Sequence, residues 1–225
     1  MQISLPLAMT MGEPAGIGGE IALKAWLDHD AMNLPPFFLI DDPQRLERLA
    51  TRLDLAVPVQ VIETPDQAMA SFGAALPVLP LSSIPGGIEV EPGQAQAKYV
   101  PAILQSIDRA VELAMAGAVA GIVTNPIHKK TLYDGGFSYP GHTEYLALKA
   151  GIETPPVMML TCPGLRVVPV TIHMSLREAV EALNTEVIVT NGKVTAAALQ
   201  RDYGIANPRL AVAGLNPHAG EDNAM

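Results

Sequence analysis

The sequence is poor in the residues on which several protein classes depend. One cysteine, Cys162, among 225 residues excludes an intramolecular disulfide and fits a reducing compartment. Its neighbours are apolar, which predicts a buried, inert thiol rather than a nucleophile. Aromatic residues make up only 4% of the chain, so the core must be built from Ala, Val, Leu, Ile and the ten Met residues.

Basic residues and long apolar runs are scarce as well. The chain has 14 Lys and Arg against 23 Asp and Glu, and the resulting formal net charge of -9 repels a phosphodiester backbone. No apolar run reaches the length that spans a bilayer, and no basic segment precedes an apolar one at the N-terminus. We therefore expect a cytoplasmic protein that binds neither nucleic acid nor a membrane.

What the sequence does contain is a regular order of apolar segments. Apolar residues account for 49% of the chain and charged ones for 16%, enough for a sizeable core. Strand-like runs alternate with helical patterns, which predicts an α/β fold with a mostly parallel sheet and helices on both faces. Cys162-Pro163-Gly164 joins two strand-like runs and predicts one antiparallel hairpin. Strands are predicted at 5–10, 36–40, 57–62, 76–81, 118–123, 156–161, 165–171 and 208–214, and helices at 21–27, 42–53, 65–72, 95–116, 145–150, 176–183 and 186–203.

No linker marks a domain boundary, and we place the division after Val123, which gives domains 1–123 and 124–225. Two loops carry groups suited to a ligand. The Gly-rich segment 11–20 lies between a strand and a helix, but its spacing matches no standard phosphate-binding motif and also fits a tight turn. In the second loop, Pro140-Gly141 makes a turn and Thr143 falls where the N-cap of a helix is expected. Such a helix start suits a phosphate or carboxylate, whereas a capped helix beside a loop His142 is the simpler interpretation.

Four of the five His residues each follow a strand-like run by a few positions. In open α/β sheets the residues just beyond the carboxyl ends of the strands line the ligand crevice. His173 and His218 are the best candidates for metal ligands, because neither lies in an apolar helical setting. Two imidazoles leave a divalent cation under-coordinated, so a third ligand is required. Glu221 fits either a group that orients such a site or a solvated loop acid. The single Cys and the lack of a G-x-S-x-G motif argue against a thiol or serine hydrolase.

Five motifs follow one another along the chain: MGEPAGIGGE (11–20), TNPIHK (124–129), YPGHTEYLA (139–147), VVPVTIHMSLR (167–177) and AGLNPHAGE (213–221). Together they resemble the 4-hydroxythreonine-4-phosphate dehydrogenase family of pyridoxal phosphate biosynthesis. The sequence departs from the family at Glu13, where Asp is frequent, and at Gly19, where Pro is usual. The resemblance implies a three-layer α/β/α fold, similar to the isocitrate and isopropylmalate dehydrogenases, and a homodimer.

The resemblance also implies a role for specific residues. His142 and Thr143 would contact the phosphorylated substrate, and His173 and His218 would bind a divalent metal such as Zn, Mg, Co or Mn. It implies NAD- or NADP-dependent oxidation of 4-phosphooxy-L-threonine and loss of carbon dioxide to give 3-amino-2-oxopropyl phosphate. A metal on the alcohol oxygen would favour the alkoxide for hydride loss and stabilise the enolate that decarboxylation leaves.

Family members continue beyond Met225, and the continuation carries the third metal His and the nicotinamide-cofactor site, so the sequence assigns neither. If these residues are the whole molecule, we expect weak metal binding and no dehydrogenase turnover. Three alternatives remain open. One is a relative that acts on a four-carbon threonate or erythronate phosphate. The others are a non-catalytic phosphate- or metal-binding domain and a phosphate acetyltransferase-like enzyme, which needs no metal.

Overall fold

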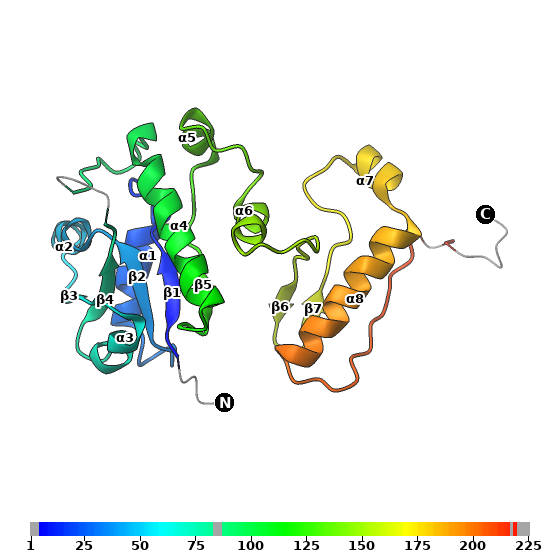
Figure 1. The fold of residues 1–225 in the computed structure, drawn as a ribbon, viewed down its shortest axis with the longest axis horizontal. Coiled ribbons are helices and arrows are strands. Elements are labelled where there is room, and N and C mark those ends of the chain that lie inside the picture. Colours follow the sequence, from blue (N-terminus) through cyan, green and yellow to red (C-terminus); the bar gives the residue numbers. More distant parts are fainter. Residues whose placement is uncertain (1–4, 83–86, 217, 220–225) are drawn as a thin grey trace. The chain divides into compact units, whose positions relative to one another are not determined.

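The chain contains two compact units, residues 1–154 and 155–225 (Figure 1). The computed structural model describes residues 5–82, 87–216 and 218–219. The division predicted after Val123 falls inside the first unit and stays a prediction about domains. Over the described ranges, no helix is both long and apolar enough to cross a membrane.

The first unit is built on a parallel sheet of five strands in the order β3-β4-β2-β1-β5. In the register, Leu7 lies opposite Phe37 on one side and Gly121 on the other. β3 lies at an edge, as the internal Pro58 of its run predicts. The mostly parallel α/β fold is thereby confirmed. The strands are β1 (Leu7–Thr10), β2 (Phe37–Asp41), β3 (Val59–Val61), β4 (Leu76–Pro80) and β5 (Gly121–Val123).

Helices cover both faces of this sheet. Because side chains alternate along a strand, Leu39 packs under one helical layer while Phe38 and Ile40 pack under the other. The first layer consists of α1 (Gly18–Leu27) and α2 (Pro43–Arg52), and the second of α3 (Pro65–Ser71) and α4 (Val100–Met115), which a short 3-10 helix (Ala97–Tyr99) precedes.

Asp42 fixes the start of α2 and a distant loop together. Its Oδ1 accepts the N–H of Gln44 at 2.9 Å, which caps the helix ahead of Pro43 in the first turn. Its Oδ2 accepts the N–H of Ile88 at 2.7 Å. One side chain therefore holds the segment 87–93, which we call the strap, against α2.

Two further helices, α5 (Lys129–Asp134) and α6 (His142–Lys149), complete the first unit. They pack on α4 through a cluster that includes Ile107, Leu132 and Tyr145. The N-cap of α6 is Gly141 and Thr143 is the second helical residue, so the predicted N-cap at Thr143 is wrong. The backbone of Gly141 is extended at φ -178°, so the helix begins immediately after the turn.

The second unit begins with the predicted hairpin. β6 (Leu160–Cys162) and β7 (Leu165–Val167) pair antiparallel, with Cys162 opposite Leu165 and Gly164 at φ 84° in the turn. This confirms the hairpin. Cys162 is exposed, so the prediction of a buried thiol is wrong. The physical reason is that every residue of this two-stranded ribbon is exposed, whatever its polarity.

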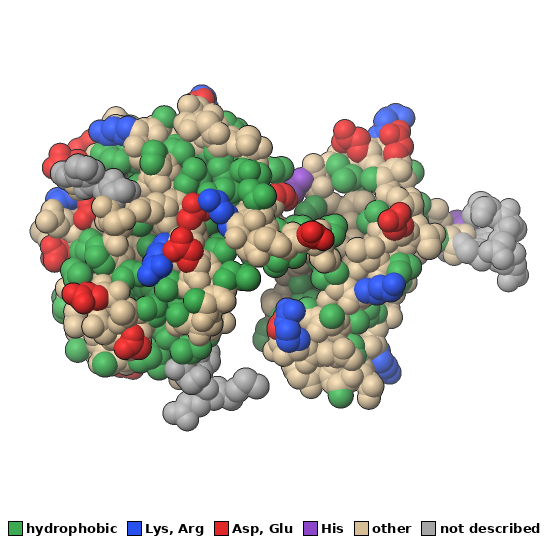
Figure 2. Space-filling view, viewed as in Figure 1, with side chains coloured by type: hydrophobic (Ala, Val, Ile, Leu, Met, Phe, Trp, Pro, Cys, Tyr) green, Lys and Arg blue, Asp and Glu red, His purple; other side chains and the backbone are tan. Residues whose placement is uncertain are grey.

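The rest of the second unit is helical. Ser175 and Glu178 form a capping box at the start of α7 (Leu176–Ala182), where a helix is predicted at 176–183. α8 (Thr185–Arg201) follows. The strand predicted at 208–214 does not form, because no neighbouring strand pairs with it within the described chain. On the face shown in Figure 2, basic side chains lie scattered or beside acidic ones, as the net negative charge leads us to expect.

Candidate functional site

The chain adds strands on one side of β1 first and on its other side afterwards. The chain passes from β1 to β2 on one side, and after β4 it crosses to β5 on the other side of β1. β1 and β5 run in register, with Met9 opposite Val123. The Gly-rich turn 11–17 and the loop 124–128 therefore leave the sheet side by side at a topological switch point, where open α/β sheets bind their ligands.

Three hydrogen bonds join the end of β1 and the Gly-rich turn to the loop 124–128. The backbone N–H of Asn125 donates to the Thr10 hydroxyl at 3.2 Å, and its side-chain amide donates to the Thr10 carbonyl at 2.9 Å. The N–H of Glu13 donates to the Pro126 carbonyl at 2.8 Å. Asn125 is buried, so these bonds fix the floor of the crevice out of contact with water.

The glycines of the turn are required by this close approach. Gly12 has φ +69°, and a Cβ there would lie 2.6 Å from the Pro126 carbonyl oxygen. A Cβ at Gly18 would lie 2.9 Å from the Cβ of Asn125. A side chain at either position would push the two loops apart, which explains the glycines better than a tight turn alone.

Ser106 of α4 also supports the crevice, although no sequence motif includes it. Its hydroxyl accepts the N–H of Met11 at 2.9 Å and donates to the Ile40 carbonyl at 2.7 Å. The only signal in the sequence is one hydroxyl among the apolar positions of this helix. The contact spans 95 residues and could not be inferred from local pattern.

Glu13 places a buried carboxyl group within the Gly-rich turn. It is 6% exposed, and its Oε1 accepts the N–H of Ala15 at 3.1 Å. Its Oε2 is buried and has no hydrogen-bond partner among the residues that the structure describes. Burial raises the pKa of Glu13, although the Ala15 hydrogen bond and the charges of His128 and Arg45 act in the opposite direction. Glu13 is therefore a candidate proton acceptor or donor beside a bound ligand.

A second group of polar side chains lies at the start of α6. The Nε2 atom of His142 is buried and has no hydrogen-bond partner within the described ranges. Burial and the charge of Lys129 lower the pKa of His142, which favours a neutral imidazole. A Cβ added at Gly141 would lie 4.0 Å from the Lys129 ammonium. Lys129, His142 and the first N–H groups of α6 thus come together as donors, and the Glu144 carboxylate in the same turn lies beside them, with its Oε2 3.7 Å from that Cβ position.

Asp108 of α4 anchors α6 in this position. It accepts the Tyr145 hydroxyl at 2.7 Å through Oδ1 and the Lys149 ammonium at 2.7 Å through Oδ2. Burial and the contact with Asp108 raise the pKa of Tyr145 to about 12, so the phenol stays protonated and donates. These bonds hold the helix that presents His142 and Thr143.

His173 and His218 both lie exposed in the second unit. His173 has φ 55° and precedes the cap of α7 by two residues, while the N–H of His218 donates to the Asn216 side chain at 2.8 Å. Glu221 lies outside the described residues. Over the part of the chain that is described, no group of three His, Cys, Asp or Glu is placed to hold a metal ion. These residues do not complete a metal site, and the assignment of His173 and His218 stays a prediction.

A parallel, doubly wound sheet with a glycine-lined crevice at its switch point defines a ligand-binding α/β protein. Comparison with known sequences makes the class specific. Residues 33–225 match the family described as pyridoxal phosphate biosynthetic protein PdxA, and the chain belongs to this family.

Individual relatives agree with this assignment. The 4-hydroxythreonine-4-phosphate dehydrogenase of Methylorubrum populi is 48% identical over 226 aligned positions, which cover 98% of this chain and 64% of that protein. The protein of the same name from Bradyrhizobium diazoefficiens is 46% identical over 230 positions, covering 98% of this chain and 66% of that protein. The chain thus spans 64–66% of the length of these relatives.

Solved structures show the same fold. The crystal structure of 4-hydroxythreonine-4-phosphate dehydrogenase from Klebsiella pneumoniae matches with a TM-score of 0.85 at 38% identity, over 97% of this chain and 66% of that chain. A terephthalate 1,2-cis-dihydrodiol dehydrogenase from Burkholderia xenovorans matches less well, with a TM-score of 0.63 at 27% identity, over 97% of this chain and 64% of that one.

Proposed function

We propose that this protein oxidises and decarboxylates 4-phosphooxy-L-threonine to 3-amino-2-oxopropyl phosphate, with NAD or NADP as hydride acceptor, in pyridoxal phosphate biosynthesis. We further propose that it works as a homodimer in the cytoplasm. The observation that carries the proposal is the donor group at the start of α6, where the buried Nε2 of His142, near Lys129, has no hydrogen-bond partner among the residues that the structure describes. Nearly the whole chain is similar to proteins named for this reaction.

This donor group suits a phosphorylated hydroxy acid. The Lys129 ammonium and the backbone N–H groups of the first turn of α6 supply positive potential for a phosphate or carboxylate group, whereas the Glu144 carboxylate in that turn opposes it. A neutral His142 imidazole can exchange a hydrogen bond with a substrate hydroxyl, and Thr143 adds a second hydroxyl in the first turn. Substrate contact by His142 and Thr143 is part of the proposal.

The proposal includes a divalent metal, such as Zn, Mg, Co or Mn, as a Lewis acid that would polarise the substrate alcohol. His173 and His218 would hold it. Since the described residues supply two imidazoles and no complete set of ligands, no step of the reaction is derived through the metal. In this proposal the described residues bind and orient the substrate, and Glu13 contributes a buried carboxyl group.

The test is turnover by the protein expressed from its complete reading frame. NADH or NADPH formation is followed with 4-phosphooxy-L-threonine, and 3-amino-2-oxopropyl phosphate is identified by mass spectrometry. His142→Gln should reduce kcat/KM by roughly 10- to 100-fold, because it removes a group aimed at the substrate. Absence of NADH with every divalent metal tried would refute the proposal.

A second candidate function is oxidation of another hydroxy acid, such as threonate or erythronate phosphate. The observation that favours it is the related fold of a dehydrogenase whose name specifies a dihydrodiol of terephthalate. The same assay separates the two functions when the amino and hydroxy versions of the four-carbon phosphate are compared. A higher kcat/KM for the hydroxy version would replace the first candidate. Phosphoester binding without any turnover would instead favour a non-catalytic binding domain.

A further inference from the structure

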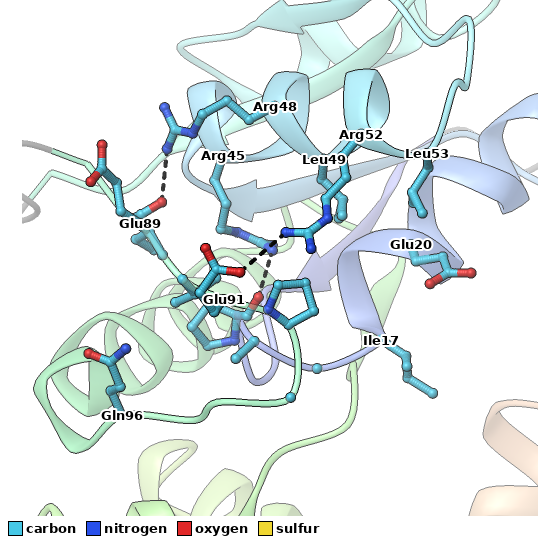
Figure 3. A pocket seen from close by; sticks show the side chains of 17 residues that line it. Ile17, Glu20, Arg45, Arg48, Leu49, Arg52, Leu53, Glu89, Glu91 and Gln96 are labelled. Atoms are coloured by element: carbon cyan, nitrogen blue, oxygen red, sulfur yellow. Dashed lines mark hydrogen bonds and ion pairs between the residues drawn. The ribbon is translucent and has the colours of Figure 1, made fainter.

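Arg45 is the buried arginine of α2, and its side chain extends from this helix toward the Gly-rich turn (Figure 3). It lies in the wall of a cavity of about 830 Å³ between α2, the turn and the strap. Arg48 and Arg52 of the same helix also line this cavity, but their side chains are 48% and 57% exposed, whereas Arg45 is 4% exposed. A guanidinium that is buried needs partners for its charge and for its N–H groups.

Three hydrogen bonds hold Arg45 in place. Its Nε and Nη2 atoms donate to the two carboxylate oxygens of Asp41 at 3.0 and 2.5 Å, and its Nη1 donates to the Pro14 carbonyl at 3.2 Å. Asp41 is buried as well. A buried ion pair adds little net stability, because the desolvation of both charges offsets their attraction. The pair with Asp41 instead fixes the plane of the guanidinium, and this directs Nη1 to Pro14.

The Pro14 carbonyl belongs to the same peptide group as the Ala15 N–H. This N–H donates to the Glu13 carboxylate at 3.1 Å, while the carbonyl accepts from Arg45. Because a peptide group is planar and trans, a partner that fixes the carbonyl also fixes the direction of the N–H on the opposite side. Arg45 and Glu13 therefore hold the two ends of one peptide group, and each hydrogen bond strengthens the other by polarisation.

Gly19 at the start of α1 leaves the space that the guanidinium occupies. A Cβ at Gly19 would lie 3.1 Å from Nη1 and 3.2 Å from Nη2 of Arg45. It would also lie 2.8 Å from a methyl group of Leu49, which can rotate away, whereas a guanidinium held at three points cannot. The lack of a side chain at Gly19 thus allows Arg45 to reach Pro14.

Two charged groups act on the Glu13 carboxyl within the described chain, His128 from the loop 124–128 and Arg45 from α2. The other charged side chains that line the cavity beside the turn are partly or fully exposed: Glu20, Arg48, Arg52, Glu89 and Glu91. Burial raises the pKa of Glu13, and the Ala15 hydrogen bond, His128 and Arg45 each act in the opposite direction. Arg45 thus acts on Glu13 in two ways, by its charge and through the peptide N–H that it orients.

We propose that Arg45 is a positioning residue for Glu13. Through the Pro14–Ala15 peptide group it fixes the hydrogen bond that holds the Glu13 carboxyl in the Gly-rich turn. That this carboxyl takes part in the reaction rests on the proposed function. The position of the carboxyl and its titration do not, so the two are tested separately.

Carbon-13 NMR titration of the Glu13 side chain in the full-length protein tests the positioning directly, with the resonance assigned by Glu13→Gln. The variant Asp41→Asn/Arg45→Met removes both charges of the buried pair and keeps an acceptor for the Asp42 N–H, which Asp41 binds at 2.7 Å. We expect the midpoint of the Glu13 titration to move to higher pH by about one pH unit. The matched control is Arg52→Met, which removes an exposed arginine from the same helix and should leave the midpoint unchanged.

Gly19→Ala tests the same contact from the other side and keeps the inference testable if the double variant does not fold. Alanine suits a helix better than glycine, so helix propensity adds no penalty. Its Cβ displaces the guanidinium without removing its charge, and we expect a smaller shift of the Glu13 midpoint in the same direction. In the Asp41→Asn/Arg45→Met background Gly19→Ala should not shift the midpoint further, because the guanidinium that it displaces is gone.

The pH dependence of turnover shows whether the position of Glu13 serves the reaction. The limb of the kcat/KM profile that follows Glu13 should move to higher pH in both variants, together with the NMR midpoint. An unchanged Glu13 midpoint in the folded variants, even with a loss of stability, overturns the inference. A shifted NMR midpoint with an unmoved kcat/KM limb overturns the functional role of the positioning. Absence of turnover in the wild type refutes the proposed function and leaves the titration result standing.

Discussion

Asn125 forms two hydrogen bonds with Thr10, through its backbone N–H to the hydroxyl and through its side-chain amide to the carbonyl. Thr10 ends β1, and Asn125, 115 positions later in the sequence, lies two residues beyond the end of the adjacent parallel strand β5. This pairing fixes where the Gly-rich turn and the loop 124–128 leave the sheet. The position of Lys129 and of the helix that follows depends on it.

The first prediction concerns this contact. Asn125→Ala leaves the buried Thr10 carbonyl without a partner, so the free energy of unfolding should fall by about 1–3 kcal/mol. Trp26 is the only tryptophan of the chain and lies in the core of the first unit, so its fluorescence during urea unfolding measures the change. Gln60→Ala, on an exposed position of β3, is the control. Equal midpoints for the two variants would contradict the prediction.

The second prediction concerns Gly12. Gly12→Ala puts a Cβ at φ +69° and 2.6 Å from a carbonyl oxygen, so it combines backbone strain with a steric clash. We expect a loss of about 2 kcal/mol or more in the free energy of unfolding. Gly73→Ala is the matched control, since an added Cβ there meets no atom within 4 Å. It should be neutral or stabilising by about 0.5 kcal/mol. Similar losses at both glycines would show that the close approach of the two loops is not the cause.

These two contacts show what the sequence could and could not reveal. Most strand and helix positions, the hairpin turn at Gly164 and the start of α7 at Ser175 follow from local pattern, because each depends on residues within a few positions. The fit of Gly12 against Pro126 depends on sheet topology, which no local pattern specifies. The sequence gives the position of the glycine, but it does not reveal that the Pro126 carbonyl oxygen lies where a Cβ of Gly12 would be.

The failed predictions have the same origin. Thr143 has the chemistry of an N-cap, yet the N-cap is Gly141, whose backbone is extended, and Thr143 already lies inside the helix. The segment 208–214 has the composition of a strand, but a strand forms only where another strand supplies hydrogen bonds. Cys162 has apolar neighbours, but its ribbon is exposed on both sides. In each case the tertiary environment overrode a local preference.

The third prediction is the pH dependence that Glu13 introduces. Burial raises its pKa in the folded state above the ordinary value of 4.5, so the folded protein binds more protons than the unfolded chain in the interval between the two values. Stability therefore falls as pH rises from 4.5 through the folded pKa of Glu13. Glu13→Gln keeps an acceptor for the Ala15 N–H and removes the buried charge.

This variant should be more stable than wild type at pH 7, and the difference should shrink as pH falls toward 4.5. Urea midpoints measured across this pH range test it, with Glu91→Gln on the exposed strap as control. If Glu13 also serves the reaction, Glu13→Gln will lose activity while it gains stability. A pH-independent difference would show that burial does not control the Glu13 carboxyl.

The fourth prediction is that His142 makes stability depend on pH in the opposite direction to Glu13. Burial and Lys129 lower its pKa below the ordinary value of 6.5, so the unfolded chain binds more protons between the folded pKa and 6.5. Stability should rise with pH through that window and level off above 6.5. His142→Gln removes this contribution. NMR titration of the His142 ring protons measures the pKa itself, and a value above 6.5 would refute the burial argument.

The last prediction separates Lys129 from its neighbour Lys130. Lys130 binds Asp134 at 2.8 Å, and its side chain is 76% exposed, so its charge is matched and lies in water. Lys129 influences the buried His142 and lies close to Gly141 at the start of α6. Lys129→Ala should therefore weaken binding of 4-phosphooxy-L-threonine by about tenfold or more, whereas Lys130→Ala should change it less than about twofold. Calorimetric titration of both variants makes the comparison without requiring turnover. Because the two residues are adjacent, a general loss of positive charge would affect both variants alike, and equal losses would remove the anion site at α6.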